Sequence, residues 1–573
     1  MNSKIMCLLL VCGMVVPLLL AACAPAEKGE WVTGEMVRDS LGNMKEEPQY
    51  GGTLRYCWTE TQVGSWEVAA SEFGRTWHLG MYDVLTRADF TRGPSGTGEF
   101  GFTSGFFLEK FRIGGLAESW EQTDLQTVIV HLQQGIHYHD KPPVNGREMV
   151  ADDLVFCLQR TQEHPRSYLY KPPGTPAEEY YRATAIDKYT VEIKLPRPNT
   201  RPWTEFNIAV YAPELIEEYG DLEDWRNACG TGAWICTDYV PDSSITSVKN
   251  EDWWDVDPFF PENKVPYVDG FTVINIPLRT TALAALRTSQ IDWFIGVDLD
   301  DAEMLMQSNP DLQYGYDYAY YDPVIQMRND HEPFNDINVR KALTLGINRN
   351  EIAQALYGGK ALVHCWPYRP DLGEDIYIPL EQMPEDVQEL YEYNPEKAMQ
   401  LLAEAGYPDG LEVELLVSST ETHVDLAEVV KQYWDQIGVE TNVNVLELGT
   451  FYSRMYGWNY DQTAIVHWSN VNPFWITDTC YYADKLYNYS KVDDPYIIET
   501  SELLETMADA DERAAIFKEL GPYVLRQCWD IALPLEHSYV FWQPWVKGYS
   551  GEWGGGENYR WLDVDLRKHM IGE

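Results

Sequence analysis

Basic residues are scarce in this chain of 573 residues. Asp and Glu number 90 against 43 Lys and Arg, which gives a formal net charge of −47. Binding to nucleic acid or to an anionic membrane surface depends on Lys and Arg, and an acidic surface repels both. We therefore expect no nucleic acid partner, and we interpret the excess of carboxylates as a solvated surface.

The short motifs of common enzymes are also missing. No GxSxG, HExxH or GxxxxGK[ST] sequence occurs, which excludes the nucleophile elbow, the zinc-protease helix and the phosphate loop. No CxxC pair and no Cys/His cluster at zinc spacing occurs. His137 and His139 have the most metal-like spacing, but they fall in a turn before Asp140, and we expect no metal site, no catalytic residue and no cofactor.

Long hydrophobic runs are absent except at the N-terminus. Lys4 precedes an apolar stretch, residues 6–20, that is shorter than the about 20 residues of a membrane span. It ends in LAAC at residues 20–23, which resembles the bacterial lipobox. The resemblance implies that Cys23 is lipidated and becomes the mature N-terminus, and several acyl chains anchor a protein stably. The alternative is an ordinary signal peptide with an incidental cysteine.

Two N-terminal segments follow from this pattern. We assign residues 1–22 to a lipoprotein signal peptide and residues 23–47, which are polar and lack apolar periodicity, to a flexible tether. The remaining chain is long enough for two or three lobes. Seven cysteines follow Cys23, an odd number, so at least one is free; Cys229 and Cys236 are close enough in sequence for a local disulfide.

Helix-like and strand-like segments alternate along the body of the chain. Residues 127–132 and 439–446 are predicted to be strands, and residues 394–406 and 426–437 to be helices that end at glycines. Such alternation is typical of α/β architecture. No internal repeat is found.

Several segments, in order, resemble the extracellular solute-binding proteins of family 5, which bind oligopeptides, dipeptides, nickel chelates and some oligosaccharides. Any one match could arise by chance, but the ordered set from about residue 50 to 565 is specific. Lys141 departs from the family, which has Gly there. The matching segments are 116–120 (LAESW), 132–140 with 150–160, 230–234 (GTGAW), 333–343 (PFNDINVRKAL) and 394–407 (NPEKAMQLLAEAGY).

The resemblance implies an α/β fold of the type II-like periplasmic binding protein class, with two lobes, a hinge and an extra subdomain in lobe I. A ligand held between the lobes would favour the closed state because it contacts both. The expected segments are 48–86 for the first part of lobe I, 87–207 for its inserted subdomain, 208–315 for its second part, 316–530 for lobe II and 531–573 for the return to lobe I.

The implied function is that of a substrate-binding lipoprotein of an ABC importer, not an enzyme. We expect an extracytoplasmic monomer, lipid-anchored in the periplasm or on the outer face, that delivers an oligopeptide or an oligosaccharide to a membrane permease. Two alternatives stay open. One is a lipid-anchored secreted glycan hydrolase with a carboxylate pair, and the other is a binding protein repurposed as a sensor or for adhesion.

Residues 467–473 are the most informative candidate site. Peptide binders of the family have a Trp here, then an Asp that pairs with the peptide ammonium, then a Pro. Trp468 and Pro473 match, but Asn470 or Asn472 stands where the acid should be. A neutral amide is a weaker partner for a buried ammonium, whereas it suits a neutral polyhydroxylated ligand.

Aromatic residues surround this motif. Tyr456 and Trp475 lie near it in sequence, and Trp58 and Trp77 of lobe I fall where the family's first ligand contacts occur. Their rings could stack on sugar rings or simply fill the core. If Trp468 contacts the ligand, Trp468→Ala should remove ligand stabilisation and leave the melting point of the free protein near wild type. The candidate ligand-binding residues are Trp58, Trp77, Tyr456, Trp468, Asn470, Asn472 and Trp475.

Overall fold

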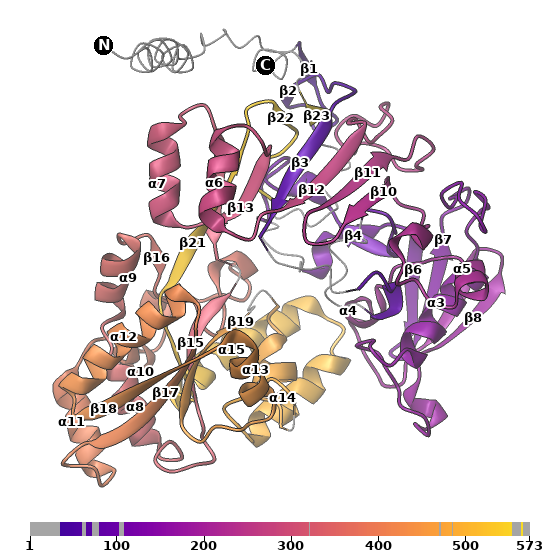
Figure 1. Ribbon diagram of the computed structural model, residues 1–573. Helices are drawn as coiled ribbons and strands as arrows, with labels where there is room; N and C mark the ends of the chain where they lie inside the picture. The colour runs from indigo at the N-terminus through magenta and orange to yellow at the C-terminus, as the bar shows by residue number, and fades with distance from the viewer. Residues whose placement is uncertain are drawn as a thin grey trace, which may run out of the picture.

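The computed structural model describes residues 35–59, 65–70, 80–101, 108–319, 321–468, 472–483, 485–552 and 563–564 (Figure 1). The predicted signal peptide (residues 1–22), Cys23, and the candidate residues Trp77 and Asn470 lie outside the described residues. Two large sheets, each flanked by helices, form the two lobes, so the predicted two-lobe α/β fold is confirmed.

Lobe I is built on an eight-stranded sheet with the order β10-β11-β12-β3-β13-β21-β14, and β16 also pairs with β21. Helices α6 (Arg279–Arg287) and α7 (Leu299–Ser308) pack against this sheet. The strands are β3 (Thr53–Trp58), β10 (Trp234–Val240), β11 (Ser244–Lys249), β12 (Gly270–Asn275), β13 (Trp293–Val297), β14 (Gln313–Tyr318), β16 (Ala361–Leu362) and β21 (Leu535–Trp542).

Lobe II is built on a five-stranded sheet with the order β18-β17-β19-β15-β20. Every residue of β15 (Asp322–Met327) is buried because helices cover both faces of the sheet. Val324 and Ile325, which are adjacent in this strand, point into two different core clusters. The other strands are β17 (Leu411–Ser418), β18 (Val439–Leu446), β19 (Thr463–Trp468) and β20 (Asp530–Ala532).

The helices of lobe II surround this sheet (Figure 1). α12 packs directly on β17 and β18, and α11 packs on α8. A five-residue π-helix, η9 (Ile476–Cys480), lies shortly after β19. The α-helices are α8 (Ile337–Leu345), α9 (Arg349–Tyr357), α10 (Glu385–Gln388), α11 (Pro395–Glu404), α12 (Glu421–Gln436), α13 (Leu448–Tyr456), α14 (Pro495–Thr506) and α15 (Ala510–Gln527).

A smaller body lies within the predicted insertion, residues 87–207. It is a four-stranded antiparallel sheet, β6-β7-β9-β8, with the helix α3 (Ala151–Glu163) packed on it. Its strands are β6 (Ala117–Asp124), β7 (Thr127–Leu132), β8 (Arg182–Asp187) and β9 (Thr190–Lys194), and the nearby short elements are β4 (Thr86–Ala88), β5 (Arg112–Gly114), α4 (Trp203–Phe206) and α5 (Pro213–Tyr219).

Two strands continue from one lobe into the other and form the hinge. β14 leads into β15, and β20 leads into β21. The crossing chains are bonded to each other: Ala319 N donates to the Glu536 carbonyl and Leu533 N to the Pro323 carbonyl, both at 2.9 Å. The predicted lobe boundaries fall after residues 315 and 530, whereas β14 runs to Tyr318 and β20 runs to Ala532.

The predicted tether was wrong for its second half. Within residues 23–47, β1 (Met36–Arg38) and β2 (Met44–Glu46) pair as a hairpin. The hairpin is attached to lobe I because Ser40 N donates to the Phe259 carbonyl at 2.8 Å and Lys45 lies 3.4 Å above the Phe259 ring. A polar composition therefore concealed ordered structure that depends on contacts distant in sequence. The hairpin β22 (Val546–Lys547) and β23 (Asp563–Val564) lies near the other end of the chain.

The seven cysteines that follow Cys23 are all buried and free. The possible Cys229–Cys236 disulfide is therefore not formed in the structure. Burial raises the pKa of both thiols, to about 12 for Cys229 and about 11 for Cys236, so neither is a reactive thiolate near neutral pH.

A carboxyl group is buried at the start of β20. Asp530 Oδ2 accepts hydrogen bonds from Gln326 Nε2 and from the Tyr481 hydroxyl, each at 2.7 Å. Its Oδ1 contacts the Ser490 hydroxyl, which also lies 2.6 Å from Gln326 Oε1. One hydroxyl proton serves one acceptor, so a protonated Asp530 completes the network by donating to Ser490. Burial raises the pKa of Asp530 to about 7.

We predict that Asp530→Asn stabilises the protein above neutral pH. The pKa of Asp530 is raised from 3.8, so its favourable contribution is complete at low pH and is lost as the pH rises to about 7. Asn supplies an acceptor oxygen for Gln326 and Tyr481 and an N–H donor for Ser490, and it does not titrate. Urea unfolding should show the variant to be more stable than wild type at about pH 8 and similar to it at about pH 4. A variant that is less stable at both pH values would contradict a neutral Asp530.

Candidate functional site

Strand direction determines which edge of the lobe I sheet faces lobe II. β12 and β13 run parallel to β3, and β14 runs the same way because both β13 and β14 are antiparallel to β21. β14 is the strand that leaves for lobe II at its carboxyl end. The carboxyl ends of β3 and β12, which are Trp58 and Asn275, therefore point towards lobe II.

Strand direction also determines which edge of the lobe II sheet faces lobe I. β15 enters from lobe I, and β19 is antiparallel to it, so the carboxyl end of β19 returns towards lobe I. Trp468, its last residue, pairs with Asp322, the first residue of β15. Trp58 and Trp468 therefore lie at the two sheet edges that face each other, and the carboxyl ends of parallel strands are where ligands bind in α/β folds.

Trp468 belongs to an aromatic cluster on lobe II. Its ring centroid lies 5.0 Å from Tyr489 in a stacked arrangement, 5.7 Å from Trp475 and 5.8 Å from Tyr487. Tyr456 extends the cluster, with its ring 6.0 Å from Tyr487 and 5.8 Å from Tyr452. We call these six residues the aromatic cluster: Tyr452, Tyr456, Trp468, Trp475, Tyr487 and Tyr489.

The members of the aromatic cluster differ in exposure. Trp468 is 4% exposed and Tyr489 1%, whereas Tyr456 is 41% exposed and Trp475 and Tyr487 are half-buried. The buried rings support the outer ones, whose π-faces and edges remain partly accessible. The Trp468 Nε1 donor is buried and has no acceptor among the described residues. Trp468 is thus the support of the cluster rather than its outer surface.

Asn472 has a structural role at the start of the next segment. Its Oδ1 accepts a hydrogen bond from Phe474 N at 3.1 Å, and its carbonyl accepts one from Trp475 N at 2.9 Å. This is an Asx-type turn that leads into the π-helix η9. The turn fixes the position of Trp475, so Asn472 acts on the aromatic cluster through the backbone.

Trp58 supplies the facing edge of lobe I. It is half-buried at the end of β3, with its ring 6.0 Å from Tyr56, and it pairs in register with Asn275 of β12. Asn275 Oδ1 is buried and has no donor among the described residues. Asn275, Tyr487 and Tyr489 were not predicted from the sequence, because no family motif covers them and only the fold brings them to this edge.

Two imidazole rings stack at the lobe II edge. His423 in the first turn of α12 and His467 of β19 have ring centroids 3.7 Å apart and planes 14° apart. Burial lowers the pKa of His423 to about 4 and the pKa of His467 well below its usual range, so both rings are neutral at physiological pH. Within the described parts of the chain, no three His, Cys, Asp or Glu side chains are placed to hold a metal ion.

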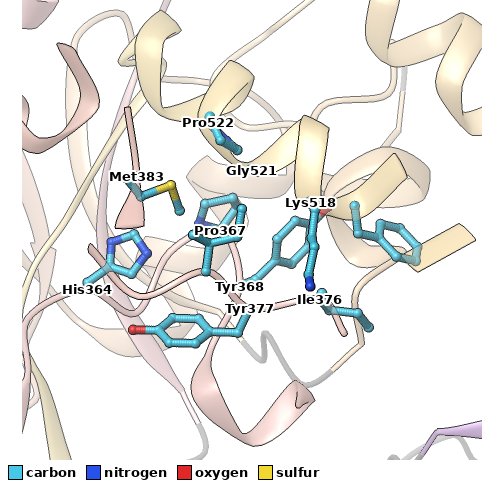
Figure 2. Close-up of a pocket in the computed structure, with 11 residues that line it drawn as sticks. His364, Pro367, Tyr368, Ile376, Tyr377, Met383, Lys518, Gly521 and Pro522 are labelled. Carbon is cyan, nitrogen blue, oxygen red and sulfur yellow. The ribbon is translucent and has the colours of Figure 1, made fainter. Parts of the chain in front are cut away.

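A small cavity lies elsewhere in lobe II (Figure 2). It is lined by residues of the segment 364–383 and of α15, including Tyr368, Met383 and Pro522, and by none of the predicted site residues. Even its empty volume of about 190 Å³, which includes open solvent, is below the about 300–1,000 Å³ of small-molecule sites. We therefore do not assign the ligand site to it.

Residues 113–486 match the family described as bacterial extracellular solute-binding proteins, family 5 Middle. This match covers well over half of the chain. It includes the hinge strand β14, all of β15 and β19, and most of the aromatic cluster. No helix within the described residues has the length and apolar character needed to cross a membrane.

Individual relatives match over most of their length. Heme-binding protein A of Haemophilus influenzae is 26% identical over 589 aligned positions, covering 96% of this chain and 97% of that protein. The dipeptide-binding protein of Escherichia coli is 26% identical over 494 positions, covering 77% and 85%. The solved structure of the periplasmic binding protein DppA from Helicobacter pylori in complex with the peptide STSA has a TM-score of 0.68, 21% identity, and coverage of 90% and 99%.

The burial of Trp468 changes the expected effect of its substitution. We predict that Trp468→Ala lowers the free energy of unfolding by about 3–5 kcal/mol because it leaves a cavity beneath the aromatic cluster. Tyr456→Ala should cost about 1 kcal/mol because the ring is partly exposed. Urea unfolding of both variants measures the difference. Equal small losses would mean that Trp468 does not support the cluster.

Proposed function

Because the chain belongs to the bacterial extracellular solute-binding proteins of family 5, we propose that it captures a peptide or an oligosaccharide between its lobes and delivers it to an ABC permease. The observation that carries this proposal is the placement of the aromatic cluster and Trp58 on sheet edges that face each other across the hinge. The relatives and structures it matches are binding proteins, which leaves the hydrolase alternative without support.

The proposed mechanism is closure around the ligand. The two crossings, β14 to β15 and β20 to β21, form the hinge, so rotation about them brings Trp58 towards the aromatic cluster. A ligand that contacts both edges binds the closed state better than the open state and shifts the population towards it. The permease would then select the closed form.

Two observations bear on the ligand class. Relatives named for dipeptides and a solved complex with a peptide favour a peptide. Against this, Asn470 or Asn472 occupies the position of the expected acid, and Asn472 Oδ1 is used in a turn. The outer rings of Tyr456, Trp475 and Tyr487 suit the faces of sugar rings. Both a peptide and an oligosaccharide are therefore proposed, and a ligand screen distinguishes them.

We also propose that Cys23 carries the lipid anchor, which keeps the protein at the membrane beside its permease. Cys23→Ser should move the protein from the membrane fraction to the soluble extracytoplasmic fraction, because three acyl chains bind a bilayer far more strongly than none. Immunoblots of fractionated cells measure this, and metabolic labelling with a palmitate analogue should be lost in parallel. A variant that stays membrane-bound and labelled would contradict lipidation at Cys23.

We predict that one compound class stabilises the purified protein. A ligand at about 100 times its Kd adds about 2.7 kcal/mol to the free energy of unfolding. The screen compares peptides of two to five residues, neutral oligosaccharides and hemin, the last because one relative is named for heme. Thermal unfolding is the measurement, and a stabilising peptide or oligosaccharide is the expected result.

Two variants test where the stabilising compound binds. Tyr456→Ala should raise the apparent Kd of the stabilising compound at least about tenfold and so reduce the thermal shift. The reason is that Tyr456 is an exposed ring of the aromatic cluster. Tyr316→Ala is the matched control, since Tyr316 is 61% exposed but lies on β14, away from the cluster. An equal effect of both variants, or none from Tyr456→Ala, would place the ligand elsewhere. A shift by hemin alone would contradict the proposed ligand classes.

A further inference from the structure

A loop of the inserted subdomain reaches lobe II. This loop, residues 197–201, follows β9, and we call it the latch segment. It is fixed to its own subdomain because Asn199 N donates to the Leu125 carbonyl at 2.9 Å and Gln122 Nε2 donates to the Asn199 carbonyl at 2.6 Å. Arg201 N in turn donates to Asn199 Oδ1 at 2.7 Å. The latch segment therefore moves with the subdomain.

Arg201 makes the main contact across the lobes. Its Nη2 lies 2.8 Å from Asp478 Oδ2, and its guanidinium carbon lies 3.2 Å from the centre of the Phe474 ring. Arg201 is 6% exposed, so this charge-assisted bond is screened little by solvent. Beside it, Thr200 N donates to the Glu505 carbonyl of α14 at 3.0 Å.

The acceptor on lobe II is held in place. Asp478 lies in the π-helix η9, and its Oδ1 accepts hydrogen bonds from the Thr477 and Ser501 hydroxyls, each at 3.0 Å. Oδ2 is thereby presented to Arg201. Phe474 is fixed by an edge-to-face contact with Phe517 of α15, at 4.9 Å between ring centres. Both groups that receive Arg201 are thus held in place by contacts within lobe II.

Charge is distributed unevenly across this contact. Three ion pairs join the described residues of the subdomain to those of lobe II, and in each the cation belongs to the subdomain. They are Arg201–Asp478, Arg197–Glu505 at 3.7 Å and Lys110–Asp375 at 3.6 Å. In a chain with a formal charge of −47, a cationic edge that meets an acidic one favours contact where other surfaces would repel.

The latch segment lies away from the hinge crossings. In Figure 1 the crossing strand β21 lies at the left, whereas α4, which directly follows the latch segment, lies to the right beside the helices around α14. A small rotation at a hinge produces its largest displacement at the points most distant from it. We therefore expect the Arg201 contact to break early when the lobes rotate apart.

The latch also joins the candidate ligand site. Phe474, which receives Arg201, directly precedes Trp475 of the aromatic cluster, and Trp475 contacts Trp468 at 5.7 Å. We propose that Arg201 is a positioning residue that fastens the lobes in the closed conformation and holds residues 472–480 in the form that presents Trp475 to the ligand. The role in ligand capture rests on the proposed function, whereas the fastening of the lobes does not.

The test measures closure in the protein alone, so that it is independent of any ligand. Spin labels are placed on Ile186→Cys of the subdomain and Met399→Cys of lobe II, which are 58% and 45% exposed. The background lacks residues 1–22, which contain Cys7 and Cys12, and carries Cys23→Ser, so that only the seven buried native cysteines remain, and these resist labelling. Pulsed electron spin resonance then reports the distribution of distances between the two lobes.

We expect Arg201→Ala to add a longer-distance population and to lower the closed-to-open ratio about tenfold, the effect of losing a hydrogen bond to a charged group. Asp478→Asn should act in the same direction, and the double variant should change the ratio no more than Arg201→Ala alone. Arg226→Ala is the matched control, because its side chain is 69% exposed and its ion pair, with Asp224, does not reach lobe II; it should match wild type.

Circular dichroism and urea unfolding confirm that each variant is folded. The charge exchange Arg201→Asp with Asp478→Arg should restore part of the short-distance population, which a purely structural defect would not do. Unchanged distances in both Arg201→Ala and Asp478→Asn would overturn the latch. That result would leave the proposed function intact, and a failed ligand screen with a working latch would overturn only the function.

Discussion

The pairing of two strands across the hinge is the constraint on which the rest of the molecule depends. β14 and β21 are antiparallel neighbours in lobe I, and each continues directly into the sheet of lobe II. Arg369, which is fully buried, reinforces this junction by donating to the Ala319 carbonyl at 3.0 Å and pairing with Asp371 at 2.7 Å. Because strand direction is fixed at these crossings, the carboxyl edges of both sheets must face each other.

That constraint explains why one aromatic cluster both fills the core of lobe II and lies at the edge that faces lobe I. A ring at the last residue of β19 lies at once at the end of a buried strand and at the edge that faces the other lobe. Trp468 therefore fills the core beneath Trp475 and Tyr487, and the outer rings gain a rigid support without further backbone structure. Rigid aromatic side chains lose little conformational entropy when a ligand binds, so a preformed cluster favours affinity.

Local patterns predicted much of the fold and little of the long-range structure. The strand expected at residues 127–132 is β7, and the helix expected at 394–406 contains α11, because both depend on periodicity and end signals within a few residues. The hairpin at residues 36–46 was mistaken for a tether because its stability comes from Phe259, more than 200 residues away. Tyr487 and Tyr489 belong to the candidate site only because they pack against Trp468 in the folded protein. The family motif identified Trp468 as a candidate but did not predict that it is buried.

The acidic composition and the latch have opposite effects on closure of the lobes. A chain with 90 acidic and 43 basic residues resists bringing its own surfaces together, and this self-repulsion favours an open molecule. Closure then requires cations at the meeting edge, and Lys110, Arg197 and Arg201 supply them from the subdomain. Of these, only Arg201 is buried, so only its contribution persists when salt screens the exposed pairs. Repulsion over the whole surface and attraction at one buried point together allow a modest ligand contribution to decide between the open and the closed state.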